Sequence, residues 1–421
     1  MKIDTLCVQA GYQPKNGEPR VLPIAQSTTF AYDSAAAMGA LFDLEAEGFF
    51  YTRLANPTLD AVEKKIAALE GGVGAMLTSS GQAASLISVT NICKAGDHVI
   101  ASAAIYGGTF NLFNKTLRDL GIDFDFVEPD IAADELDKAF KENTKAVFVE
   151  TITNPSLDVV DLEMFASVAH AHHCPLIVDN TFATPINCRP FEWGADIIVH
   201  STSKYLDGHA VALGGCVVDS GNFDWNSGDF KMLTTPDETY HGVIYTEQFG
   251  KAAYIVKART HLMRDYGTQA APQNAFLLNL GLETLHLRMR RHCDNALAVA
   301  KFLENHDKVE SVDFPGLESN KYYAVAQKYM PNGSCGVISI CVKGGKDGAV
   351  RFMEALKLAK IVTHVADART CVLHPASTTH RQLTEQQLID AGIAPNMVRF
   401  SVGIEDPEDI IADVAQALEQ V

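Results

Sequence analysis

The chain has 421 residues, 47% hydrophobic and 20% charged, a composition typical of a globular protein larger than one ordinary domain. Its formal net charge of −18 argues against a nucleic-acid partner, whose phosphates require a basic surface. The longest apolar runs have only the length of strands and the N-terminus lacks a signal-peptide core, so we expect a cytoplasmic protein with no membrane span.

The first 60 residues are rich in proline and show weak periodicity. We expect them to form an extended arm, and a long irregular segment of this kind often has a specific task such as reaching a neighbouring chain. Leu59, Val62, Ile66 and Leu69 then recur at helical spacing, which predicts a helix over 58–70.

Short apolar runs alternate with helical segments from residue 73 to residue 219. The runs predict strands at 74–77, 98–101, 124–127, 146–149, 176–178, 196–199 and 215–218. Helices are expected between them at 82–93, 108–120, 132–141 and 161–173. This alternation predicts an α/β fold with a mainly parallel, doubly wound sheet.

The polar stretch 221–242 is expected to be a surface insertion, followed by helical segments over 243–265 and 272–305. Later strands are predicted at 309–314, 337–342, 371–373 and 398–402, and later helices at 347–358, 385–391 and 407–418. These elements predict a smaller C-terminal α/β domain. The predicted organisation is an arm over 1–60, a large domain over 61–260 and a small domain over 261–421.

Polar residues follow two buried runs of the predicted sheet. Asp179 follows the run 176–178, and Ser201, Ser203 and Lys204 follow the run 196–199. Such strand ends are where open α/β sheets place their sites. A lone lysine after a strand is usually a surface residue, but this combination suits pyridoxal phosphate (PLP). The lysine can form a Schiff base, the acid can hold the pyridine nitrogen protonated and the hydroxyls can bind phosphate.

Ser80, Gly81 and Gln82 open a predicted helix directly after the run 74–77. Backbone N–H groups at a helix start bind phosphate, although many β–turn–helix units use Ser-Gly without a ligand. Neither a G-x-G-x-x-G motif nor a Walker lysine motif is present, so nucleotide binding is unsupported.

These motifs resemble the Cys/Met-metabolism PLP-dependent enzymes, from Tyr51-Thr52-Arg53 to the VRFSVGIED motif around Arg399. The resemblance implies a fold-type I PLP-dependent transferase with a mainly parallel seven-stranded sheet. It also implies that Lys204 carries the cofactor, that Asp179 pairs with the pyridine nitrogen, and that the protein is a homotetramer built as a dimer of dimers.

The resemblance assigns the remaining roles residue by residue. Ser80, Gly81, Gln82, Ser201 and Ser203 would bind the cofactor phosphate, and Tyr106 would stack on the ring and assist proton transfer. Asn154 would contact the ring oxygen, and Arg399 would bind the substrate α-carboxylate. Tyr51 and Arg53 would reach the cofactor phosphate of the neighbouring subunit, with Tyr51 also near the substrate.

The chain departs from the family at 364–366. The family usually has Asn-x-Gly or Ser-x-Gly before Asp367-Ala368, at the carboxylate site, whereas this chain has His364-Val365-Ala366. We expect His364 to lie in the substrate site, where an imidazole is larger than an amide and can titrate.

Within the family, residues 240–242, 263–292 and the motif HPASTTHRQLT at 374–384 resemble the O-acetylhomoserine sulfhydrylases. The implied reaction converts O-acetyl-L-homoserine and sulfide into L-homocysteine and acetate, and a thiol in place of sulfide would give the corresponding thioether. A methionine γ-lyase, which eliminates without an incoming nucleophile, remains an alternative, as does another γ-synthase or lyase of the family.

Readings from other classes also remain open. Ser201-Thr202-Ser203-Lys204 matches the S-x-x-K motif of cofactor-free serine hydrolases, in which Ser201 or Ser203 would act with Lys204, but S-D-N and K-T-G partner motifs are missing. A non-catalytic binding protein would keep the fold without the chemistry. Nine dispersed cysteines without a C-x-x-C pair favour reduced thiols, and we expect no metal at the histidine clusters 170–173 and 374–380.

Overall fold

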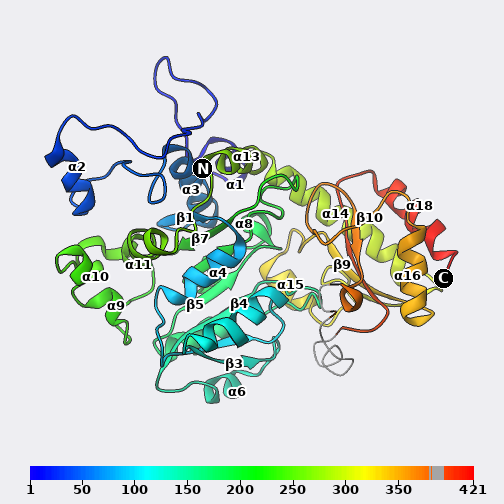
Figure 1. Cartoon of the computed structure of the whole chain (residues 1–421). Helices are drawn as coiled ribbons and strands as arrows, with labels where there is room; N and C mark the ends of the chain where they lie inside the picture. The colour runs from blue at the N-terminus through cyan, green and yellow to red at the C-terminus, as the bar shows by residue number, and fades with distance from the viewer. Residues whose placement is uncertain (379–380, 382–392) are drawn as a thin grey trace.

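The computed structural model describes residues 1–378, 381 and 393–421 (Figure 1). A seven-stranded sheet lies at the centre of its larger unit. The strand order is β1-β7-β6-β5-β4-β2-β3, and only β7 runs antiparallel to its neighbours. The strands are β1 (Gly74–Thr78), β2 (His98–Ser102), β3 (Asp123–Val127), β4 (Thr144–Glu150), β5 (Leu176–Asp179), β6 (Ile197–His200) and β7 (Gly215–Asp219). The predicted seven-stranded, mainly parallel sheet is confirmed.

Helices cover both faces of this sheet because its strands are apolar on both sides. Val147 and Val149 of β4 belong to one core cluster, with residues of α3 (Pro57–Glu70) and α7 (Leu162–Ala171). Ala146 and Phe148 belong to the opposite cluster, with residues of α4 (Gly81–Thr90) and the π-helical turn η1 (Leu112–Leu117), which continues α5 (Gly107–Asn111). The remaining connections carry α6 (Ala133–Lys138) and the short elements α8 (Thr184–Asn187) and η2 (Pro190–Trp193).

A second sheet of five strands confirms the smaller C-terminal α/β unit. Its order is β10 (Lys360–Ile361), β11 (Cys371–Leu373), β12 (Met397–Ser401), β9 (Val337–Val342) and β8 (Val309–Asp313). The helices packed on it are α14 (Leu285–Glu304) and α16 (Gly345–Ala355), and α18 (Pro407–Leu418) packs against these two helices. Neither β10 nor α15 (Tyr323–Tyr329) was predicted, and the helix predicted at 385–391 lies outside the described residues.

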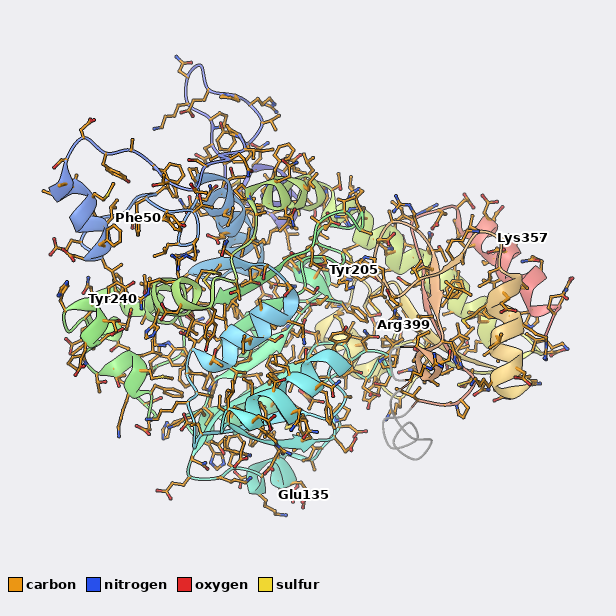
Figure 2. The ribbon with its side chains drawn as sticks, in the orientation of Figure 1. Phe50, Glu135, Tyr205, Tyr240, Lys357 and Arg399 are labelled. Atoms are coloured by element: carbon orange, nitrogen blue, oxygen red, sulfur yellow. The ribbon has the colours of Figure 1, made fainter. Side chains whose placement is uncertain are left out.

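The predicted arm contains two short helices rather than only extended chain. In α1 (Ile3–Gln9), Ile3, Leu6 and Cys7 pack into the core beside α3, so the first turns belong to the body of the molecule. The part carrying α2 (Ala35–Phe42) projects away from it, with the Phe50 ring 4.4 Å from the ring of Phe42 (Figures 1 and 2). The boundaries 1–60, 61–260 and 261–421 stay a prediction.

The stretch 221–242 is not only a surface insertion. It contains α9 (Lys231–Thr234) and η3 (Glu238–Tyr240) and buries Trp225, whose ring stacks on that of Tyr254 at 5.2 Å. The following helical stretch is broken into α10 (Tyr245–Phe249), η4 (Gly250–Ala252), α11 (Ala253–Lys257), η5 (Ala258–Met263) and α12 (Arg264–Tyr266). The predicted helix 272–305 is divided at Thr284 into α13 (Pro272–Glu283) and α14. No helix among the described residues has both the length and the apolar character to span a bilayer.

Candidate active site

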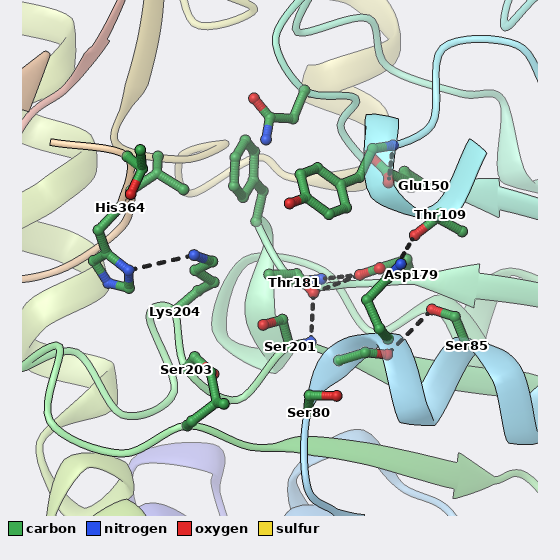
Figure 3. A pocket seen from close by; sticks show the side chains of 18 of the residues that line it. Ser80, Ser85, Thr109, Glu150, Asp179, Thr181, Ser201, Ser203, Lys204 and His364 are labelled. Carbon is green, nitrogen blue, oxygen red and sulfur yellow. Dashed lines mark hydrogen bonds between the residues drawn. The ribbon is translucent and has the colours of Figure 1, made fainter. Parts of the chain in front are cut away.

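A cavity of about 470 Å³ opens where the carboxyl ends of β4, β5 and β6 meet residues 363–365 and Arg399 of the smaller unit. Glu150 and Asp179 end β4 and β5 and are register partners, so their side chains enter the cavity side by side. Figure 3 shows both carboxylates on the side of the cavity opposite Lys204 and His364. The parallel strands thus gather side chains that are far apart in the sequence.

The start of α4 forms a cradle of hydrogen-bond donors. The Ser80 hydroxyl caps the helix by accepting from the N–H of Ala83 at 3.2 Å. A Cβ on Gly81 would lie 2.7 Å from Cβ of Ser201, so glycine lets the loop after β6 approach the helix start. Serine hydroxyls and free N–H groups at the end of a ten-residue helix fit a phosphate group. The Gln82 side chain is held by the Thr109 hydroxyl, which donates to its Oε1 at 3.0 Å.

Lys204 is the amine of the cavity. Burial, and then the nearby positive charge of Arg399, lowers the pKa of Lys204 to about 8. Its Nζ lies 3.3 Å from Nδ1 of His364 and contacts no carboxylate among the described residues. A lysine with this pKa is a free amine in about a tenth of the molecules at pH 7, far more than an ordinary lysine, which suits both covalent attachment and proton removal.

The two carboxylates lie in a strongly desolvated corner. Asp179 accepts from the Thr181 N–H at 3.0 Å and from the Thr181 hydroxyl, while Glu150 accepts from the Tyr106 N–H at 2.7 Å. Burial raises the pKa of Asp179, and burial together with the charge of Asp179 raises the pKa of Glu150 well above its usual range. Such a pair fits a cationic group, and a protonated pyridine nitrogen is one.

Arg399 lies in β12 and is only 5% exposed. Its guanidinium donates to Oδ1 of Asn154 at 3.3 Å and to the carbonyl of His364 at 3.2 Å, and among the described residues no carboxylate pairs with it. Burial lowers the pKa of this guanidinium. A buried arginine with only neutral acceptors is a suitable partner for an incoming carboxylate.

The structure brings together every predicted site residue except Tyr51 and Arg53. Those in the cavity wall are Ser80, Gly81, Gln82, Tyr106, Asn154, Asp179, Ser201, Ser203, Lys204, His364 and Arg399. Arg53 instead lies over the ring of Tyr51 at 5.2 Å and donates to the Arg264 carbonyl, outside the wall. Their predicted contact with a neighbouring subunit's cofactor stays a prediction.

Sequence reasoning missed several polar residues of the cavity wall, of which Glu150 and Thr181 contact other site residues most directly. Glu150 follows the apolar run 146–149 as Asp179 follows 176–178, so the same strand-end signal was present. Thr181 binds Asp179 and also accepts from the N–H of Ser201 at 2.9 Å, joining the two strand ends. A threonine two residues after an aspartate is a common turn, and nothing local marks it as part of a site.

The contacts argue against a serine–lysine hydrolase. The Ser203 hydroxyl accepts from the N–H of Gly214 at 3.0 Å and donates to its carbonyl at 3.2 Å. The Lys204 backbone N–H donates to the Ser201 carbonyl at 3.3 Å, but among the described residues the Lys204 amine makes no hydrogen bond to Ser201 or Ser203. The lysine is therefore not placed as the base of either serine.

The histidine clusters have other partners. His170 and His172 bind Asp196 and Asp137 at 2.8 and 2.7 Å. No group of three or more potential metal ligands occurs in the part of the chain that the structure describes. His374 binds the Pro395 carbonyl at 2.8 Å, whereas His380 and most of the rest of the 374–384 motif after Thr378 lie outside that part.

Comparisons with known proteins agree with this geometry. Residues 4–419 match the model of the family described as Cys/Met metabolism PLP-dependent enzyme. Homocysteine synthase of Schizosaccharomyces pombe is 47% identical over 99% of this chain and 98% of its own length. O-acetyl-L-homoserine sulfhydrylase of Leptospira meyeri is 42% identical over 100% of this chain and 97% of its own.

Solved structures extend the likeness to three dimensions. A Campylobacter jejuni crystal structure containing N′-pyridoxyl-lysine-5′-monophosphate has a TM-score of 0.96, with 36% identity and full coverage of both chains. The predicted fold type is therefore confirmed. The chain belongs to the Cys/Met metabolism PLP-dependent enzyme family, and its cofactor is pyridoxal phosphate.

Proposed function

We propose that this enzyme performs γ-replacement, converting O-acetyl-L-homoserine and sulfide into L-homocysteine and acetate. One observation carries the proposal: a lysine whose pKa is lowered to about 8, the desolvated Asp179 and an arginine that pairs with no carboxylate of the described residues share one cavity. The names of its full-length relatives in Schizosaccharomyces pombe and Leptospira meyeri support the substrate assignment.

The side chains would hold the cofactor and the substrate in fixed places. Ser80, Ser201, Ser203 and the first N–H groups of α4 would bind the phosphate, with Gln82 beside them. Asp179 would hold the proton on the pyridine nitrogen, Tyr106 would cover the ring and Asn154 would contact its oxygen. When bound, pyridoxal phosphate supplies an electron sink for negative charge that develops beside the amino group.

Lys204 would do the proton transfers. Arg399 would fix the substrate α-carboxylate through its two guanidinium nitrogens, which turns the Cα–H bond toward the Lys204 amine. Lys204 would take a proton from Cα and then one from Cβ, and loss of the second allows the γ-acetoxy group to leave. Sulfide would then add at Cγ, and the protons would return to Cβ and Cα.

Two assays on one purified sample test this function. One supplies O-acetyl-L-homoserine with sulfide and follows homocysteine, and the other supplies L-methionine alone and follows 2-oxobutanoate. Homocysteine formed with little 2-oxobutanoate is the expected result. Fast 2-oxobutanoate formation from methionine would instead identify a degradative γ-lyase. The absence of both products would indicate a non-catalytic binding protein.

Replacing Arg399 by alanine should raise KM for O-acetyl-L-homoserine about 10²- to 10³-fold, because a buried charge pair with the α-carboxylate is lost. Arg399→Lys should recover only part of this, since a lysine keeps the charge but lacks the planar fork. The cofactor spectrum should change little in both variants. Steady-state kinetics with varied substrate provide the measurement, and an unchanged KM would place the carboxylate elsewhere.

The predicted crossing of the arm can be tested with mixed oligomers. If Arg53 serves the neighbouring site, Arg53→Ala chains mixed with Lys204→Ala chains should regain about a quarter of the wild-type activity, because one site of each mixed dimer is intact. Asp179→Asn mixed with Lys204→Ala is the matched control, since both residues line one chain's cavity and no mixture restores a site. Recovery no greater than in this control would show that the arm serves its own chain.

We also propose a cytoplasmic homotetramer, built as a dimer of dimers, that acts on small molecules and not on nucleic acid. The net charge of −18 supports the last point. Val21, Ile24 and Phe42 are exposed apolar side chains of the 1–60 segment, which supports its contact with another chain.

A further inference from the structure

Arg259 joins three parts of the chain at the base of the 1–60 segment. It lies in the π-helical turn η5, and turns of this kind are rare and occur frequently at functional sites. Its guanidinium donates to the Leu54 carbonyl at 2.9 Å, to the Ala75 carbonyl of β1 at 3.0 Å and to Oε2 of Glu63 in α3 at 2.7 Å. The side chain therefore ties the segment both to the larger sheet and to a helix that packs beside β1.

The carboxylate of Glu63 fixes this guanidinium, and we call the two residues the clamp. Glu63 is only 5% exposed, and its Oε1 accepts from the Leu77 N–H at 2.8 Å while its Oε2 accepts from Arg259. Burial raises the pKa of Glu63, and the charge of Arg259 opposes that rise. A carboxylate held at both oxygens gives the arginine one geometry, and loss of the arginine alone would leave a buried carboxylate without its cation.

The carbonyl that Arg259 binds belongs to the turn that carries Tyr51 and Arg53. In this turn the N–H of Leu54 donates to the Tyr51 carbonyl at 3.0 Å, and the Arg53 guanidinium lies over the Tyr51 ring. Neither side chain is among the described residues that line the cavity of its own chain, and Tyr51 is 41% exposed. The turn thus keeps both side chains away from that cavity while Arg259 holds its backbone.

Earlier residues of the segment are attached to the same base. The Asn56 amide donates to the Ala25 carbonyl at 2.9 Å, and the Thr58 hydroxyl donates to the Pro23 carbonyl at 2.8 Å. A displacement of the base would therefore move a larger part of the segment than the turn alone.

The proposed contact of Tyr51 and Arg53 with a neighbouring subunit's cofactor, on which this inference rests, needs a turn of fixed orientation. A free surface turn samples many conformations, and ordering it on binding costs conformational entropy. We propose that Arg259, braced by Glu63, is a positioning residue that holds this turn so that Tyr51 and Arg53 meet the phosphate in the neighbouring site. Arg259 itself touches neither cofactor nor substrate.

The contacts of the clamp with β1 allow one competing role. Ala75 and Leu77 belong to β1, which leads to Ser80 in the cavity of the same chain. Under that role Arg259 would support the phosphate cradle of its own subunit. The two roles therefore differ in which subunit's site fails when the clamp is lost.

Mixed oligomers separate these two roles. Combining Glu63→Gln with Arg259→Met removes the clamp without leaving a buried charge unpaired. Oligomers of this double variant alone should lose at least about 10-fold in activity at limiting cofactor, because misplacing a group by about 1 Å can cost about 100-fold. Mixed with Lys204→Ala chains, the double variant should regain about a quarter of the wild-type activity, since one site of each mixed dimer keeps its lysine and receives an intact arm.

Hydrogen exchange followed by mass spectrometry gives a readout without turnover. In the full-length, cofactor-loaded protein, Arg259→Lys keeps a charge beside Glu63 but lacks the planar fork that reaches three acceptors. Residues 50–56 should then exchange at least about 10-fold faster than in wild type, while residues 74–78 of β1 stay within about 2-fold. Equal exchange of residues 50–56 in both proteins would show that Arg259 does not hold the turn, and would overturn the inference.

Arg290→Lys is the matched control for the exchange measurement. Arg290 also ties the 1–60 segment to the body of the molecule, but through Asp4 of α1 at 2.9 Å and not through the turn. Its replacement should leave the exchange of residues 50–56 and the affinity for the cofactor as in wild type.

The outcomes separate this inference from the proposed function. If Arg53→Ala chains recover activity when mixed with Lys204→Ala chains but the double variant does not, Arg259 serves its own site and only this inference is wrong. If neither recovers, the crossing of the arm falls and the inference falls with it. A double variant as active as wild type would also overturn it. The choice between γ-replacement and γ-elimination is unaffected, because the mixtures can be assayed with either product.

Discussion

Replacing Lys204 by alanine is expected to lower the turnover of O-acetyl-L-homoserine by at least about 10⁴-fold, the upper end of what one positioned acid–base group contributes. The visible absorption band of lysine-bound cofactor should also disappear. Both effects have one cause, since the proposed function makes this amine the attachment point and the base. The pKa of about 8 explains why the amine is usable near neutral pH.

Lys257 provides a matched control. Burial lowers its pKa to about 8 as well, but it lies outside the cavity wall and donates to the Asn91 carbonyl at 3.0 Å. Lys257→Met should therefore keep the cofactor band even if its melting temperature falls. Absorbance spectra, kinetics and thermal melts of both variants make the comparison. A coloured, active Lys204→Ala protein would remove Lys204 from the mechanism.

The strands of the larger sheet were predictable because they are buried on both faces. A run such as 146–149, Ala-Val-Phe-Val, has no polar residue, and few structures other than a central parallel strand accept it. The order of the strands was not predictable, because β1 lies beside β7 through contacts between residues that are distant in the chain. β10 has two exposed residues and therefore no pattern to detect.

The polar stretch 221–242 shows why local composition misleads. Its many polar and turn-forming residues suggested a surface loop, yet Trp225 and Phe230 are buried against each other with ring centroids 5.1 Å apart. The Trp225 ring also stacks on the ring of Tyr254, which is too far along the chain for a short sequence window to include. Isolated aromatic residues in a polar stretch are thus better evidence of burial than its average hydropathy.

The position of a site residue was predictable where a single strand end marked it. Asp179 and Lys204 were inferred from their positions after buried runs, and the cavity contains both. The contact between His364 and Lys204 was not predictable, because it depends on how the smaller unit meets the larger sheet. The roles of Arg399 and Asn154 came from the family resemblance, and their 3.3 Å contact is consistent with a shared site.

Replacing Asp179 by asparagine should weaken cofactor binding about 10²- to 10⁴-fold, because removing one partner of a buried ion pair costs about 3–5 kcal/mol. The amide keeps the size of the side chain and one acceptor for Thr181. Turnover at saturating cofactor should fall as well, since a neutral amide does not hold the pyridine nitrogen protonated. Wild-type affinity in a cofactor titration would remove Asp179 from this role.

In the protein without cofactor, the same substitution should raise the stability of the fold. Burial raises the pKa of Asp179, so the folded chain binds its proton more tightly than the unfolded chain does. A group of this kind contributes stability that is present at low pH and lost as the pH rises through the raised pKa. Asp179→Asn should therefore melt at a higher temperature than wild type at pH 8, and the difference should vanish as the pH falls toward about 4.

Asp196 is the matched control for both measurements. Burial raises the pKa of Asp196 too, but this residue precedes β6, at the amino end of the strand and away from the cavity. It accepts from the Leu176 N–H at 2.8 Å. Asp196→Asn should leave cofactor affinity unchanged. If only Asp179→Asn combines greater stability with weaker cofactor binding, the desolvation of Asp179 is a cost that the cofactor's positive charge offsets. The acid would then be kept at the end of β5 for catalysis and not for stability.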